Sequence, residues 1–285
     1  MLSLSVRKED FLCYVPLFLI VILFLPVFLA LYRFKWKTID YTHAYFILPV
    51  SLWLAWRERN RLKELIKSPS TLGNIVGLLI LLFGSALFIF GWRNEYLMIL
   101  SFSLIPILVG YIYFIFGLKV LRLLWFPLFY LFLMVPPPSG ILDSITIPMR
   151  YGITVAVQVF LSFLGYPIVR EGLLLILNGN EIYMGAPCSG FRSLITLLSL
   201  GLVYTYISSG NIKTKASLGI SIIPMALLGN FLRVISVCLA INYFGVKIGE
   251  IVHDVFGYVV FIILILGLIC LENLCLGLEK KNEAA

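Results

Sequence analysis

Apolar runs long enough to cross a bilayer follow one another along almost the whole chain, and no other feature limits its fold as strongly. A helix of about 20 apolar residues spans the hydrocarbon core of a membrane, which is about 30 Å thick. Of the 285 residues, 61% are hydrophobic and only 13% are charged, so a soluble domain of this length could not cover its apolar surface. We expect transmembrane helices near residues 11–32, 41–56, 72–92, 96–116, 121–135, 191–207, 216–240 and 251–274. The sequence therefore predicts an all-α polytopic membrane protein with about eight transmembrane helices.

These runs are expected to form a single integral membrane domain over residues 1–285, built from three parts. Residues 1–135 make an N-terminal five-helix part, residues 136–187 an extracytoplasmic part, and residues 188–279 a three-helix part with the candidate catalytic residues. In the extracytoplasmic part, the Asn178-Gly179 step predicts a short hairpin, because both residues tolerate the positive φ of a tight two-residue turn.

The Lys and Arg clusters fall on one side of the membrane if residues 141–164 do not cross it. Cytoplasmic loops of membrane proteins carry an excess of Lys and Arg. The clusters are Arg57 to Lys67, Lys119/Arg122, Lys213/Lys215 and Lys280/Lys281. Because the last two would lie outside if residues 141–164 crossed, and because that segment contains Asp143 and Arg150, we expect it to be an interfacial helix. The predicted location is the plasma membrane, with both termini in the cytoplasm, and the net charge of +8 then reflects these loops rather than nucleic-acid binding.

Three polar side chains from successive predicted spans reach the same outer level of the membrane. Cys188 precedes the span 191–207, where a helix N-terminus and Arg192, one turn further on, would stabilise a thiolate. Arg233 lies about 17 residues into the next span, about 26 Å from its cytoplasmic end at roughly 1.5 Å per residue. His253 follows at the start of the last span. An arginine in an apolar helix costs about 2.5 kcal/mol or more on insertion scales, so this convergence favours a functional site at the extracytoplasmic face.

Each of the three residues also has a structural interpretation. Cys188 would be an ordinary thiol at a helix end, Arg233 would extend toward the lipid headgroups, and His253 would be an interfacial histidine. Their arrival at one depth weakens these readings. The other histidine, His43, lies near the outer end of its own span and either borders the same cavity or anchors the interface, and the sequence leaves both open.

The three residue types suit acyl transfer. A Cys188 thiolate would attack a peptide carbonyl and form a thioester, Arg233 would stabilise the oxyanion, and His253 would protonate the leaving amine. Neighbouring residues have supporting roles in this hypothesis. Asn230 would orient Arg233, and Glu250 or Asp254 would orient His253, although Asp254 would point elsewhere in a regular helix.

The sequence contains no motif that indicates a bound metal or cofactor. The chain contains no HExxH, GxSxG or Walker motif, which argues against zinc proteases, serine hydrolases and ATPases. Its five cysteines show no CxxC spacing, which argues against a zinc site and a disulfide framework. We therefore expect no metal and no cofactor.

Several short stretches carry a resemblance to a known family. They are Tyr41-Thr42-His43, Phe126-Pro127-Leu128 running into Met134-Val135-Pro136, Gly165 to Gly172, Pro187 to Ser193, Asn230 to Val234, and His253-Asp254. Together they resemble the exosortases and archaeosortases, which are multi-span transpeptidases with a Cys, Arg and His set. The resemblance covers nearly the whole chain, is most specific from Arg170 onward, and implies that the catalytic set is Cys188, Arg233 and His253. His43, Arg170 and Glu171 lie in the same stretches and are further candidates for lining the site.

The resemblance also implies partners. The substrates would be exported proteins with a C-terminal sorting signal, which consists of a short motif, a transmembrane helix and a basic tail. Cleavage beside the motif would precede transfer to a surface acceptor, often linked to exopolysaccharide or membrane lipid. Two alternatives stay open: a membrane thiol protease without transfer, and a non-enzymatic transporter or scaffold. A transporter would be expected to show repeat symmetry or several charged residues near mid-membrane, and the sequence shows neither.

Overall fold

The computed structural model describes residues 8–37, 41, 43–66, 75–185 and 190–283. It divides the chain into two compact units, Met1–Pro138 and Ser139–Ala285, and the boundary directly follows the triple proline at residues 136–138. The unit boundary therefore lies close to the expected end of the N-terminal five-helix part.

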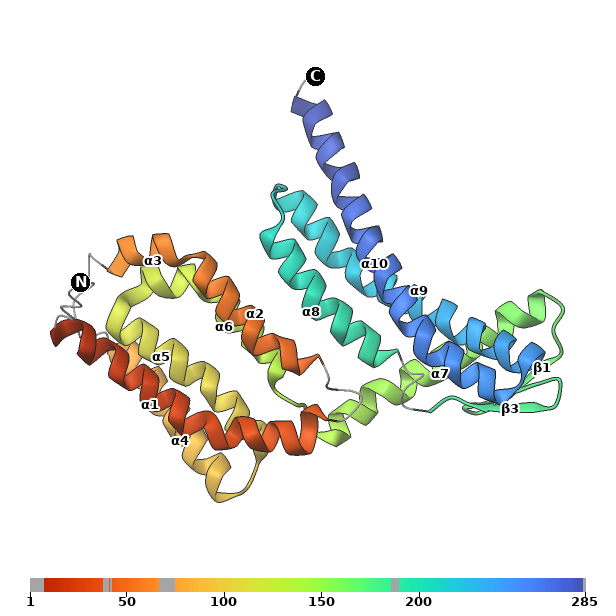
Figure 1. Cartoon of the computed structure of the whole chain (residues 1–285), viewed down its shortest axis with the longest axis horizontal. Coiled ribbons are helices and arrows are strands. Elements are labelled where there is room, and N and C mark those ends of the chain that lie inside the picture. The colour runs from red at the N-terminus through yellow and green to blue at the C-terminus, as the bar shows by residue number, and fades with distance from the viewer. Residues whose placement is uncertain (1–7, 38–40, 42, 67–74, 186–189, 284–285) are drawn as a thin grey trace, which may run out of the picture. The chain divides into compact units, whose positions relative to one another are not determined.

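The first unit is entirely helical in its described residues (Figure 1). Its elements are α1 (Lys8–Leu31) with a π-helical extension (Tyr32–Trp36), α2 (Ala44–Arg57), α3 (Arg59–Ile66), α4 (Ile75–Arg93), α5 (Leu97–Leu123), α6 (Trp125–Tyr130) and a 3₁₀ turn (Leu131–Met134). Helices α4 and α5 pack unusually closely, because Gly77, Gly84 and Gly91 of α4 are all buried. A Cβ atom at Gly84 would lie 2.7 Å from the backbone nitrogen of Ile107 on α5, so the close approach requires glycine there.

The second unit combines helices with a small sheet (Figure 1). Its elements are α7 (Ser139–Phe163), β1 (Ile168–Glu171), β2 (Leu174–Leu177), β3 (Asn180–Tyr183), α8 (Phe191–Ile207), α9 (Ile212–Phe244) and α10 (Val246–Glu283). Helices α8, α9 and α10 pack side by side around an apolar core. Buried residues of that core include Leu197, Leu218, Ile222, Val260 and Leu264.

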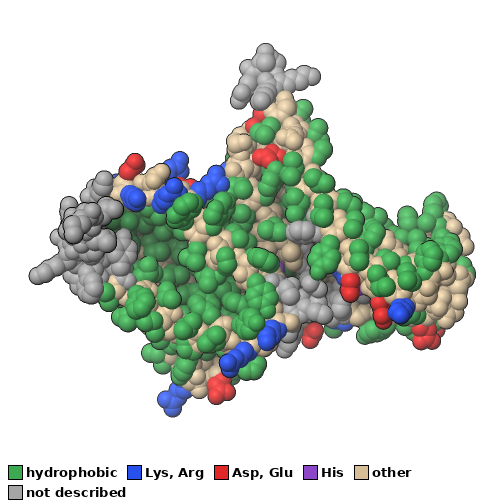
Figure 2. All heavy atoms as spheres, in the orientation of Figure 1, with side chains coloured by type: hydrophobic (Ala, Val, Ile, Leu, Met, Phe, Trp, Pro, Cys, Tyr) green, Lys and Arg blue, Asp and Glu red, His purple; other side chains and the backbone are tan. Residues whose placement is uncertain are grey.

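Six helices of the described residues are long and apolar enough to cross a membrane. They are Val15–Trp36, Ile75–Arg93, Leu97–Leu123, Gly140–Phe163, Ile212–Phe244 and Val246–Glu279. Large apolar side chains are exposed along these helices, and Figure 2 shows hydrophobic side chains over most of the visible face of each unit. The chain is thus a mostly helical polytopic membrane protein, as predicted, but the count of eight spans is not confirmed.

The expected span at residues 121–135 is not one helix. Residues 121–123 form the end of α5, which is kinked at Gly117 (φ 80°, ψ 179°), and after Leu124 the chain forms only the short apolar segment Trp125–Met134. That segment would be about 15 Å long as an α-helix, about half of the bilayer core. The expected interfacial segment 141–164 forms α7, which has the lowest mean hydropathy of the six candidate spans yet is long enough to cross. Its interfacial placement stays a prediction.

The predicted hairpin is present, together with a strand that the sequence did not indicate. β2 and β3 pair antiparallel with Leu177 opposite Asn180, and the turn residues Asn178 and Gly179 have φ values of 50° and 82°. These values match a turn with positive φ at both central positions. β1 adds to the other side of β2, which gives an antiparallel sheet of order β1-β2-β3.

One face of the sheet packs on α7 and α9. Ile168, Leu175, Leu177 and Ile182 share a buried core with side chains of these helices, including Val157, Leu161, Val234 and Cys238. Two polar contacts fasten the sheet region to the end of α9: the hydroxyl groups of Tyr166 and Tyr243 are 2.9 Å apart, and Asn178 Nδ2 donates to Asn242 Oδ1 at 2.6 Å. The sheet is therefore held against the helix that carries Arg233.

Candidate active site

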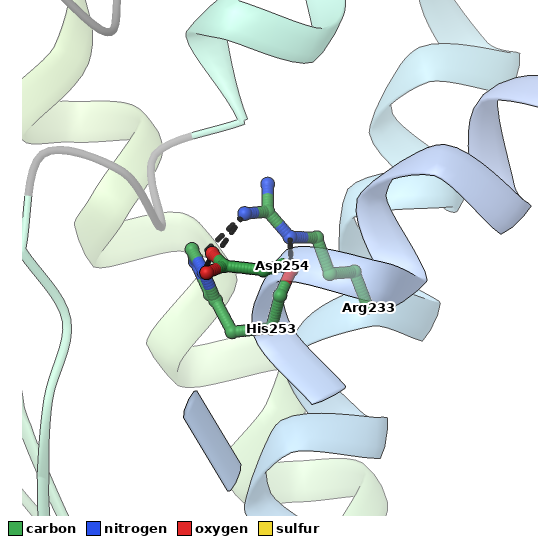
Figure 3. A network of polar contacts seen from close by, with 3 residues as sticks. All are labelled: Arg233, His253 and Asp254. Carbon is green, nitrogen blue, oxygen red and sulfur yellow. Dashed lines mark hydrogen bonds and ion pairs between the residues drawn. The ribbon is translucent and has the colours of Figure 1, made fainter. Parts of the chain in front are cut away.

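Arg233 and His253 meet between neighbouring helices. Arg233 lies on α9 with only 7% of its surface exposed, and its Nε donates to the backbone carbonyl of His253 on α10 at 3.2 Å. Its Nη2 lies 2.7 Å from Nε2 and 3.2 Å from Nδ1 of the His253 ring, and Figure 3 shows the guanidinium directed at the imidazole. Because a guanidinium can only donate, the shorter of these two contacts favours Nε2 as the acceptor. This corresponds to the imidazole tautomer with its proton on Nδ1.

Asp254 supports the same assignment. Its Oδ1 lies 3.3 Å from His253 Nδ1, where a carboxylate accepts a hydrogen bond from an N–H group (Figure 3). The expectation that Asp254 would point elsewhere in a regular helix is wrong, because the two side chains reach each other at the surface of α10. The Asp254 side chain is 83% exposed, so it acts on His253 from the solvent side.

Glu250, the other predicted orienting residue, takes no part in this contact. It is exposed on α10, one turn before His253, and among the described residues it forms no hydrogen bond or ion pair with His253. The structure thus favours Asp254 over Glu250 as the neighbour of the imidazole.

Asn230 connects Arg233 to the segment that contains Cys188. It is 3% exposed and lies one turn before Arg233 on α9. A Cβ atom at Gly190 would lie 2.6 Å from Cγ and Nδ2 of Asn230, so the glycine backbone rests directly on this carboxamide. Gly190 precedes α8 with φ 75°, a value that glycine adopts without strain. The sequence had identified Gly190 only as a turn residue, and the pairing of a small residue with a polar residue across two helices leaves no periodic signal.

Cys188 and the side chain of Arg192 lie outside the described residues, so their roles stay predictions. The chain on both sides of Cys188 is nevertheless anchored to α9. Met184 is 1% exposed in the core that contains Val234, and Gly190 rests on Asn230. Covalent geometry keeps the Cα atom of Cys188 within about 7 Å of that of Gly190. The described residues on both sides of Cys188 therefore lie against the helix that carries Arg233.

Two further candidates for lining the site, Arg170 and Glu171, lie on β1. Arg170 braces β1 against α7: its Nε donates to Gln158 Oε1 at 3.2 Å, and its guanidinium lies 4.8 Å from the centre of the Tyr151 ring. Glu171 is exposed on the opposite face of the sheet. A structural role explains Arg170 fully in this geometry.

His43 belongs to the first unit. It precedes α2, is 5% exposed, and its ring centre lies 6.1 Å from that of Tyr41. That His43 lines the site of Arg233 and His253 stays a prediction. Within the described part of the chain, no group of three or more His, Cys, Asp or Glu side chains is arranged to hold a metal ion.

Comparison with known families covers both units. A family model described as transmembrane exosortase (Exosortase_EpsH) matches residues 36–270, a range that contains Cys188, Arg233 and His253. Neither the curated proteins nor the solved structures that were searched contain a match. The family model alone covers most of the chain, and it agrees with the resemblance seen in the motifs. The chain belongs to the transmembrane exosortase family.

Proposed function

We propose that the chain is a membrane-embedded cysteine transpeptidase that cleaves the C-terminal sorting signal of exported proteins and transfers them to a surface acceptor. The observation that carries the proposal is the contact between buried Arg233 and His253, beside an α9 segment to which both flanks of Cys188 are anchored. Family membership supports a role of this class. The site would face the extracytoplasmic side of the plasma membrane, with both termini in the cytoplasm.

The partners that α10 offers to Arg233 suit a catalytic cation. They include a backbone carbonyl and the imidazole ring of His253. A buried guanidinium held in place by such contacts stabilises negative charge that develops nearby, because few mobile dipoles must reorganise around it. This arrangement supports an oxyanion-binding role better than a headgroup-binding one.

The proposed reaction gives each of the three residues a role. His253 accepts the proton of the Cys188 thiol, and the sulfur attacks the carbonyl carbon of the scissile peptide bond. Arg233 stabilises the tetrahedral oxyanion, and the C–N bond then breaks as His253 returns the proton to the leaving amine. A thioester remains on Cys188. An acceptor nucleophile gives a proton to His253, attacks the thioester and releases the thiol, which closes the cycle.

Mass spectrometry of an exported protein with a C-terminal signal of this kind tests the proposal. In cells with the wild-type enzyme we expect the protein to have a new C-terminus joined to an acceptor group. With Cys188→Ala we expect the full-length protein to accumulate, while Cys270→Ala, which changes an exposed thiol on α10, should process normally.

Two results would contradict parts of this proposal. Processing at the wild-type level by Cys188→Ala would exclude the thiol mechanism. A new C-terminus that is always a free carboxylate would retain the cysteine peptidase and exclude the transfer step.

A further inference from the structure

β3 is an edge strand that leads directly to Cys188. The sheet order places β2 on one side of β3, and among the described residues no strand lies on the other. β1, the opposite edge strand, packs against α7, whereas β3 continues through Gly185 into the segment with Cys188. We infer that the open edge of β3 binds the peptide of the sorting signal as an added antiparallel strand. This inference rests on the proposed function and names how that site holds its substrate.

The register of the hairpin shows which backbone groups face outward. Met184 N donates to Leu173 O at 2.9 Å, so these opposite residues form a hydrogen-bonded pair. Bonded and non-bonded pairs alternate along an antiparallel ladder. Asn180 and Ile182 therefore bond to β2, while the N–H and C=O groups of Glu181 and Tyr183 point away from it.

Three outward groups form a pattern that a peptide could complete. The carbonyl of Tyr183 already accepts from Gly185 N at 3.0 Å. In the described part of the chain, no residue bonds to the N–H or C=O of Glu181 or to the N–H of Tyr183. The edge thus presents a donor, an acceptor and a donor in sequence. This is the pattern that an extended antiparallel strand satisfies in β-strand addition.

The edge strand is short and carries one charged side chain, Glu181, but no proline or lysine blocks it. Natural proteins guard open edges with proline, lysine or a bulge, because unpaired backbone groups invite another strand. β3 has the sequence Asn-Glu-Ile-Tyr and contains neither proline nor lysine. Ile182 is buried at 6% exposure and holds the strand on the core, while Tyr183 is 66% exposed beside the edge. The strand is therefore fixed in place with its edge available.

The short distance in sequence between β3 and Cys188 favours an extended substrate peptide as the strand that binds the β3 edge. Tyr183 and Cys188 are five residues apart, which is at most about 17 Å in an extended chain. All strand pairs in the sheet are antiparallel, and a further antiparallel strand would continue that pattern. In this direction, the peptide residues on β3 follow the scissile bond. They join the cleavage site to the substrate's membrane helix, where unpaired backbone groups are costly.

A proline substitution on β3 tests the edge directly. Glu181→Pro removes one outward N–H, and proline is tolerated in an edge strand where its nitrogen faces away from the ladder. We expect kcat/KM for cleavage to fall about tenfold, which corresponds to about 1.4 kcal/mol. The matched control Glu181→Ala removes the side chain but keeps the N–H, and should stay within about twofold of wild type. Equal activity of the two variants would overturn the inference.

A second measurement does not depend on how Glu181→Pro folds. Synthetic peptides that span the cleavage site found by mass spectrometry would carry one N-methyl group at successive backbone nitrogens after the scissile bond. Strand addition predicts that alternate positions block cleavage, because only every second N–H faces β3. Uniform tolerance would overturn the inference. If instead Cys188→Ala still processes the substrate, the proposed function itself fails, so the two failures are distinguishable.

Discussion

At the scale of single residues, two contacts bear on the tautomer of His253. Arg233 Nη2 lies 2.7 Å from Nε2, and Asp254 Oδ1 lies 3.3 Å from Nδ1, which together favour the tautomer with its proton on Nδ1. This differs from a resting thiolate–imidazolium pair, in which both ring nitrogens would donate.

The tautomer of His253 can be read by nitrogen NMR. The chain has two histidines, so selective ¹⁵N-histidine labelling gives signals from His43 and His253 only. We expect His253 to carry its proton on Nδ1 in the wild type. Asp254→Asn should shift that signal and slow cleavage by about twofold to fivefold, the scale of a solvent-exposed charge contact. Glu250→Gln is the control and should change neither the NMR signal of His253 nor the rate of cleavage. If Asp254→Asn behaves like this control, Asp254 does not position the ring.

Arg233 should not be replaceable by lysine. Lys keeps the positive charge but lacks the planar set of donors that bonds the carbonyl and the ring together. We expect Arg233→Lys to lower turnover about 10²–10³-fold with little change in abundance, as for the loss of one oxyanion donor. Arg170→Lys is the matched control in the same unit: it should lower thermal stability while activity per folded molecule persists. Near-normal turnover of Arg233→Lys would assign the arginine to the lipid interface.

Substitution of Gly190 should lower activity, whereas the same substitution at Gly245 should not. Gly190→Ala places a Cβ atom 2.6 Å from Asn230, whereas Gly245→Ala has a similar φ of 83° and nothing within 4 Å. Both substitutions strain the backbone by about 1–3 kcal/mol, which thermal unfolding would measure. Only Gly190→Ala should also reduce cleavage, by more than about tenfold, because it pushes the backbone two residues after Cys188 away from Asn230. Equal activity losses in the two variants would show that the contact with Asn230 does not position the nucleophile.

At the scale of elements, local chemistry explains what the sequence could predict. The Asn178-Gly179 step determines the hairpin because its positive φ values are intrinsic to the two residues. β1 escaped prediction because it is only four residues long, between Pro167 and Gly172, and forms by pairing with β2. The break in the span expected at residues 121–135 also had no clear signal, since Leu123, Leu124 and Trp125, where α5 ends and α6 begins, are all apolar. The sequence predicts that Arg233 and His253 lie at the same level of the membrane. It does not predict their hydrogen bonds, because these depend on how α9 packs against α10.

At the scale of the whole molecule, the distribution of Lys and Arg predicts which loops face the cytoplasm. Exposed positions suit a labelling test better than buried ones, and Thr214 is only 3% exposed. In a cysteine-free background, Val169→Cys on β1 should react with a membrane-impermeant thiol reagent from outside intact cells. Lys213→Cys, at the start of α9, should react only after the cells are opened. Labelling of Lys213→Cys in intact cells would mean that α7 crosses the membrane and that the predicted topology is wrong.

The covalent state of Cys188 during turnover tests the central claim most directly. Acid quenching of the enzyme with its substrate, followed by proteolysis and mass spectrometry, should reveal the Cys188 peptide joined to the N-terminal part of the substrate. Hydroxylamine should remove this adduct, as expected of a thioester, and Cys270 and Cys275 should stay unmodified. Continued turnover with no adduct on Cys188, or with an adduct on another residue, would contradict the proposed mechanism.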